Sequence, residues 1–226
     1  MSRVVMRFMV GWGASALVAG CGGLSQTVDR DILKEITIEN KLLLFDAEND
    51  VSIALDEREA LQREIHNVKQ DVIDADAQVA EAESDAGRAY DKNDDKKGQL
   101  SEAAAEVFRL KIVYLQEQLG FLRSKLKAQD SLILVARAKF ELAKAKLAKN
   151  NNVRGAADIE LADFEEQVDD IVAKAKATFE DLGAYEKEVE AIKKQWLDRR
   201  EQLMAASGGG VGSPWAEDSA LWGAGQ

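Results

Sequence analysis

Apolar residues recur at alternating steps of three and four along most of this chain. Three such runs cover residues 33–89, 105–147 and 157–203. A period of 3.5 residues keeps apolar side chains on one helix face only when helices wind around one another as a left-handed supercoil. The pattern therefore predicts an all-α fold, an elongated antiparallel coiled-coil bundle of about three long helices.

Two polar segments separate the runs. Residues 91–98 are polar, end in glycine and shift the apolar phase, which predicts a turn. Across residues 150–155 the phase is preserved, so a continuous helix competes with a turn. Three successive asparagines and a glycine favour the turn. The sequence thus predicts a helical domain over residues 21–206, with helices at about 28–91, 99–149 and 156–206.

Charge differs sharply between the three runs. Residues 28–95 hold 20 acidic and 8 basic residues, residues 96–150 hold 5 and 12, and residues 151–207 hold 14 and 8. A basic helix between two acidic ones favours pairing within one chain over a parallel self-dimer. Self-association through the coiled coil stays an alternative, as does a basic face of the middle helix for anionic lipid or cell wall. The net charge of −11 disfavours nucleic acid as a partner.

The first 20 residues have the features of a secretory signal. Arg3 and Arg7 precede an apolar run at residues 8–19, which is shorter than the roughly 20 residues of a membrane-spanning helix. The run ends in Leu17-Val18-Ala19-Gly20-Cys21, and this ending resembles the lipobox of bacterial lipoproteins. The alternatives are an ordinary signal peptide followed by a free buried cysteine, and a cytosolic protein with an apolar N-terminus.

The lipoprotein resemblance implies a modification and a location. Residues 1–20 would be removed as a signal peptide, and the thiol of Cys21 would carry a diacylglycerol. This covalent lipid on Cys21 is the only non-protein group expected, and no other cofactor is predicted. The chain would be lipid-anchored in the cell envelope. Gly22 after the cysteine favours the outer membrane, facing the periplasm, in a Gram-negative cell, with the inner membrane as the alternative.

The last 20 residues differ from the helical body. Residues 207–212 are glycine-rich and predict a flexible linker. Ser213 and Pro214 then form a helix-start signature before an apolar group of Trp215, Leu221 and Trp222. Because tryptophan is enriched at binding hot spots, these three residues are the predicted docking residues for a partner. A disordered tail, or one that folds back onto the bundle, is the alternative.

The sequence offers little catalytic chemistry. His66 is the only histidine and Cys21 the only cysteine, which excludes sites built from several of either. With no glycine-rich phosphate loop either, we do not expect an enzyme.

One segment resembles a calcium-binding EF-hand loop. Asp91, Asn93, Asp95 and Glu102 occupy its positions 1, 3, 5 and 12, and their oxygens are suitable Ca²⁺ ligands. Lys96 replaces the glycine of the sharp turn, however, so a plain helix–helix turn explains the segment more simply.

These observations favour a structural or scaffolding envelope lipoprotein that holds or bridges envelope protein partners. One alternative is a regulatory sensor of Ca²⁺ or anionic lipid. Another is an accessory subunit of an envelope enzyme or transport complex.

Overall fold

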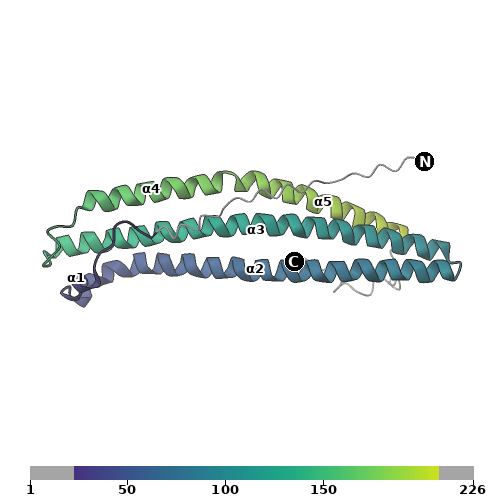
Figure 1. Cartoon of the computed structure of the whole chain (residues 1–226), viewed down its shortest axis with the longest axis horizontal. Helices are drawn as coiled ribbons and strands as arrows, with labels where there is room; N and C mark the ends of the chain where they lie inside the picture. The colour runs from purple at the N-terminus through teal and green to yellow at the C-terminus, as the bar shows by residue number, and fades with distance from the viewer. Residues whose placement is uncertain (1–22, 209–226) are drawn as a thin grey trace.

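The computed structural model describes residues 23–208, which form an elongated molecule of packed helices (Figure 1). The helices are α1 (Arg30–Lys34), α2 (Ile38–Asp91), α3 (Asp95–Asn150), α4 (Leu161–Glu180) and α5 (Leu182–Ala206). They make up 86% of the described residues, among which no strand occurs. The predicted all-α fold with long packed helices is confirmed. The expected number of about three helices is not, because the first and the third predicted helices are each divided.

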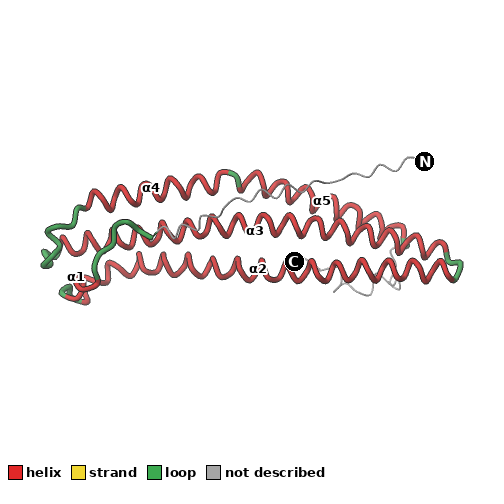
Figure 2. Tube along the Cα trace, in the orientation of Figure 1, coloured by secondary structure: helices red, strands yellow, loops and turns green. Residues whose placement is uncertain are grey.

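α2 and α3 pack against each other along the predicted apolar stripes. One buried cluster joins the two helices through Leu61, Ile65, Val68, Ala75, Leu115, Leu119 and Leu122. Asn40 of α2 contacts Asn151 just after α3, whereas Glu83 near the end of α2 contacts Arg109 near the start of α3. Residue numbers therefore rise along α2 while they fall along α3, as in a helical hairpin (Figure 2).

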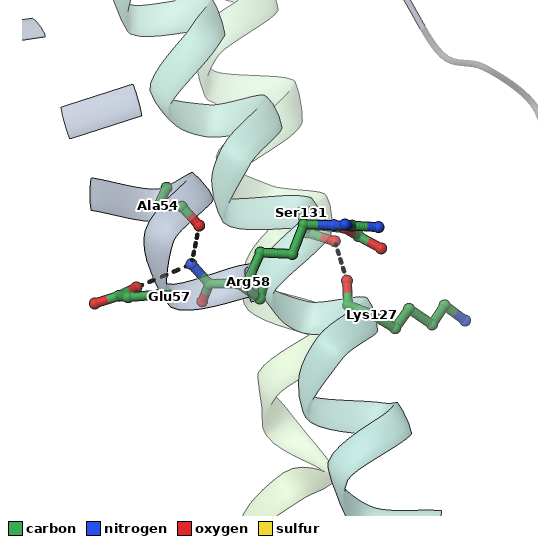
Figure 3. Close-up of polar contacts among 7 residues, drawn as sticks. Ala54, Glu57, Arg58, Lys127 and Ser131 are labelled. Atoms are coloured by element: carbon green, nitrogen blue, oxygen red, sulfur yellow. Dashed lines mark hydrogen bonds and ion pairs between the residues drawn. The ribbon is translucent and has the colours of Figure 1, made fainter. Parts of the chain in front are cut away.

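A buried glutamine fixes the alignment of this hairpin. Gln129 of α3 donates from Nε2 to the carbonyl oxygen of Ala54 and to the carboxylate of Glu57, both at 2.9 Å (Figure 3). On the neighbouring turn, Arg58 pairs with Asp130 at 2.6 Å. A slipped alignment would leave the buried amide of Gln129 without these partners, so the contact favours one register of α2 against α3.

α3 is the middle helix of the molecule. Among the described residues, α2 has no Cα atom within 8 Å of α4 or α5, whereas all three helices pack on α3. Figure 2 shows α3 running between α2 and the α4–α5 pair. On the α4–α5 side, Ala104 clusters with Trp196 of α5, and Ala145 clusters with Phe164 of α4. Both alanines are fully buried, so α3 buries a second side that the single predicted stripe did not include.

Ion pairs join α3 to its neighbours on both sides. Four such pairs in the described part of the chain are Arg109–Glu83, Asp130–Arg58, Lys146–Glu165 and Glu106–Arg199. α3 supplies the base in two of them, as its net charge predicts, and the acid in the other two. Since their side chains are at least a third exposed, each pair contributes at most about 1 kcal/mol. Apolar packing therefore contributes more to the fold than the charge pattern does.

The first turn is shorter than the predicted turn over residues 91–98, because α3 begins at residue 95 and not at 99. Asn93 takes the left-handed conformation with φ 57°, which asparagine tolerates. The carboxylate of Asp94 caps α3 by accepting a hydrogen bond from a backbone N–H of its first turn at 3.1 Å. Gly98 lies inside α3, where a Cβ atom would overlap the ring of Tyr90. Close packing, and not turn formation, explains this glycine.

Residues 151–160 contain no helix and separate α3 from α4. Asn152 and Gly155 in this segment have positive φ angles of 49° and 87°, in keeping with the turn-forming residues noted in the sequence. The predicted helix 156–206 needs correction, since α4 begins at residue 161 and Asp181 separates α4 from α5.

The predicted helix 28–91 also needs correction. Residues 35–37 separate α1 from α2, and α1 begins only at residue 30. Ile36 in this break is buried against Leu147 and Val153 at the end of α3. In Figure 1, α1 lies at the same end of the molecule as the start of α2. The break lets the chain pack Ile36 into the bundle end before α2 begins.

One half-buried lysine of α3, Lys111, opposes folding. Burial lowers the pKa of Lys111, Arg200 lowers it further, and Asp71 and Asp74 offset only part of this effect. Lys111→Met should therefore raise the free energy of unfolding near neutral pH, by less than about 1 kcal/mol because Lys111 is only half buried.

The pH dependence of this effect has a definite sign. Between the lowered pKa of Lys111 and its ordinary value near 10.5, the unfolded chain holds the proton and the folded chain does not. The wild type should therefore gain stability relative to Lys111→Met as the pH rises through this window. Urea unfolding at several pH values measures the difference, with the exposed Lys125→Met as control. A stability advantage of Lys111→Met that grows as the pH rises would contradict this assignment.

Candidate functional site

The first described residues are held against the bundle by a buried glutamine of α4. Residues 23–29 are not helical, and they precede α1. Gln167 accepts hydrogen bonds at Oε1 from the Ser25 hydroxyl and from the Gln26 backbone N–H, both at 2.8 Å. Its Nε2 donates to the Gln26 carbonyl oxygen at 3.1 Å. The side-chain amide of Gln167 thus pairs with both the N–H and the carbonyl group of Gln26.

A buried ion pair of α3 holds the next part of this segment. The backbone N–H of Val28 donates to Oε2 of Glu141 at 2.8 Å. The other oxygen of this carboxylate receives Lys144 Nζ at 2.5 Å, and Nζ lies 4.9 Å from the centre of the Phe140 ring. The side chains of Lys144 and Glu141 are only 9% and 13% exposed. Loss of either side chain would leave the other as an unpaired buried charge, which would destabilise the fold.

We call Glu141, Lys144 and Gln167 the N-terminal clamp. Apolar contacts complete it, since Val28 is buried in a cluster with Ala145 of α3 and Phe164 of α4. The clamp therefore fixes residues 25–28 across two helices. Its partners are separated by more than 110 residues in sequence.

Loss of the clamp glutamine should release this segment locally. Gln167→Ala removes three hydrogen bonds, each with a net contribution of about 1 kcal/mol, so amide exchange in residues 23–34 should speed up by roughly 100-fold. Hydrogen-exchange mass spectrometry measures this, with Gln195→Ala on the exposed face of α5 as control. Unchanged exchange in that peptide would contradict the clamp.

The residues predicted for calcium binding are not gathered into a metal site. Across residues 23–208, no group of three or more His, Cys, Asp and Glu side chains is placed to hold a metal ion. Asp91 ends α2 and Asp95 begins α3, and the left-handed Asn93 lies between them. Glu102 lies farther along α3, where it lines a shallow groove with Tyr90. The EF-hand resemblance is explained by a helix–helix turn.

His66 is exposed on α2 and lines a surface depression with Glu59, Gln62, Arg63 and Asn67. All five residues come from a single helix. The arrangement provides no buried nucleophile or base.

The other predicted site residues lie outside the described residues. Cys21 precedes Gly23 by two positions, and the docking residues Trp215, Leu221 and Trp222 follow Gly208. No helix between residues 23 and 208 is long and apolar enough to cross a bilayer.

Sequence reasoning did not identify the N-terminal clamp. Glu141 and Lys144 fit an ordinary i, i+3 pair on an exposed helix face, and Gln167 precedes the core position Val168. The available signal was the run of small residues at Ala138, Ala145 and Ala148, all fully buried, which marks a second packed side of α3.

Comparison with known protein families, with curated proteins and with solved structures gives no match. The function is therefore argued from the chain's own residues.

Proposed function

We propose that this chain is a lipid-anchored cell-envelope lipoprotein that acts as an elongated, antiparallel coiled-coil scaffold and holds or bridges envelope partners. The N-terminal clamp is the observation that supports this most strongly. It fixes Ser25 to the bundle only four residues after Cys21, a reach of at most about 14 Å. A lipid on Cys21 would thus be joined closely to the rod.

The two ends of the rod suit different roles. α2 has 54 residues and is about 80 Å long. The clamp lies at the end where α2 begins, whereas Leu203 of α5 packs with Ala82 and Ala105 near the α2–α3 turn. The tail would leave from this second end, so Trp215 and Trp222 could meet a partner far from the membrane. In a Gram-negative cell, the proposed location is the outer membrane, with the rod in the periplasm.

Two measurements on the wild-type chain test the proposal. The chain purified from membranes should begin at Cys21 and carry the mass of a diacylglycerol and an N-acyl group. Small-angle neutron scattering of the lipidated chain, with the detergent contrast-matched, should show a rod and not a compact particle. An unmodified Cys21, or a compact particle, would refute the anchored scaffold.

The partner can be sought from the far end of the rod. A photo-crosslinking residue at the exposed Met204, near the tail, should capture envelope proteins that the same residue at Val172 of α4 does not. Deleting residues 207–226 should abolish the capture if the tail docks. Equal capture with and without the tail would remove its docking role.

The calcium-sensor alternative gains no support from the turn geometry. We expect millimolar CaCl₂ to leave the Tm unchanged, because a ligand shifts Tm only by binding the folded state. Thermal unfolding followed by circular dichroism measures this, with MgCl₂ at equal ionic strength as control. A Tm rise specific to calcium would revive the sensor.

A further inference from the structure

Three large apolar side chains are exposed in the first two turns of α2. Ile38 is 75% exposed, Leu42 53% and Phe45 54%. Steps of four and three residues place them on one helix face. Leu44, by contrast, is buried against Leu147 of α3. The three side chains, which we call the end patch, therefore face away from α3.

The end patch lies at the same end of the molecule as the N-terminal clamp. Asn40, between the patch residues in sequence, hydrogen bonds to Asn151 beyond the end of α3 at 2.5 Å. Glu141 of the clamp lies nine residues before the end of α3, or about 14 Å along its axis. The described chain thus begins two residues after Cys21 within this end of the rod. A lipid on Cys21 would hold this end close to the bilayer.

The size and charge of the end patch argue against a protein partner. Three side chains cannot supply the roughly 800 Å² per partner of a stable protein interface. The same face of α2 continues with the polar residues Asn49 and Ser52, and its next exposed apolar side chain, Ile53, lies about two turns beyond Phe45. Exposed Glu39 and Asp46 carry the opposite sign to Lys41, so no single charge marks an acidic or basic partner.

We propose that the end patch rests on the phospholipid bilayer that holds the chain's own lipid. This inference depends on the proposed function. Apolar side chains on one face of a helix enter the headgroup region by about 5–10 Å, and the lipid on Cys21 makes such a small contact effectively intramolecular. The patch and the lipid together would restrict the tilt and rotation of the rod at the membrane.

The test uses the full lipidated chain in zwitterionic phosphatidylcholine vesicles. Because Cys21 is the only cysteine and is blocked by lipid, Leu42→Cys provides a single thiol for an environment-sensitive fluorophore. Ile73→Cys is the matched control, since Ile73 is 61% exposed on the same helix, about 50 Å along its axis from the patch. The label at residue 42 should shift to the blue and be quenched severalfold more by doxyl-labelled lipid than the label at residue 73.

The outcomes separate this inference from the proposed function. Quenching at residue 42 that persists in high salt supports the bilayer contact. Equal, weak quenching at residues 42 and 73 in a chain with confirmed lipid overturns the end patch and leaves the anchor intact. The label at residue 42 could instead be blue-shifted but not quenched by doxyl lipid, with a doubled particle mass in detergent. That result would assign the patch to contact with a second copy of the chain. Absence of lipid on Cys21 would refute the proposed function itself.

Discussion

Trp196→Ala is expected to lower the free energy of unfolding by about 3–5 kcal/mol, the usual cost of truncating a buried large aromatic residue. Trp196 is only 7% exposed and stacks on Tyr114 of α3, with ring centres 5.5 Å apart and planes at 8°. It also shares a buried cluster with Leu203 and Val107. Since α5 packs mainly on α3, the loss should fall on the attachment of α5.

Two probes distinguish local from global loss. Urea unfolding followed by circular dichroism gives the overall change, and hydrogen exchange reports α5 separately from the α2–α3 hairpin. We expect α5 to open first, because it packs mainly on α3, whereas α2 and α3 are packed against each other far more extensively. Phe179→Ala, at a side chain that is 39% exposed on α4, serves as control and should cost far less. If both variants unfold alike, α5 is not held by this aromatic stack.

A double-mutant cycle isolates the stack from the rest of the cavity. Aromatic pairs contribute about 0.5–1.5 kcal/mol beyond the area they bury. Tyr114→Leu and Trp196→Leu, alone and together, should therefore show a coupling of that size. Additive effects would mean that Trp196 acts through its contacts with other residues of the cluster.

The apolar period predicted the α2–α3 interface well because that interface is a property of local sequence. Steps of three and four select one helix face, and Leu61, Leu115 and Leu122 lie buried on it. The same period predicted only one apolar stripe for each helix. α3 buries two sides, and the second is built from alanines such as Ala104, which the stripe did not include. Their role is visible only once a third helix is placed beside them.

The turns were only partly predictable. Asparagines at residues 150–152 and a glycine at 155 have the conformational freedom that the turn uses, so a separation of α3 from α4 followed from residue type. Gly98 was misread because a glycine near a polar segment signals a turn equally well. Glycine is required here because the ring of Tyr90, from the other helix of the pair, leaves no room for a Cβ atom.

The N-terminal clamp depends on contacts distant in sequence. Gln167 meets Ser25 across 142 positions, and Glu141 meets Val28 across 113. Neither side chain differs locally from a solvated glutamine or glutamate. The proposed lipobox, by contrast, is contiguous in sequence, so Cys21 could be named as the proposed lipidation site although it lies outside the described residues.

Cys21→Ser is expected to have the largest functional effect of any single substitution, with nearly complete loss of the chain from washed membranes. Each buried methylene of an acyl chain contributes roughly 0.8 kcal/mol, and two or more chains hold a protein where one does not. No helix between residues 23 and 208 can replace this anchor by spanning the bilayer. The end patch alone, with three side chains, is too small to retain the protein without the lipid.

Cell fractionation after a high-salt wash, combined with metabolic labelling by palmitate, measures this prediction. Ser25→Ala is the matched control, because it alters one clamp hydrogen bond four residues away and leaves the thiol intact. That variant should stay labelled and membrane-bound. Gel mobility separates precursor from mature chain, so a Cys21→Ser chain retained through an uncleaved signal is recognised by its size. A cleaved, unlabelled Cys21→Ser chain that remains in the membrane fraction would show that contacts of the bundle, and not the lipid, hold it there.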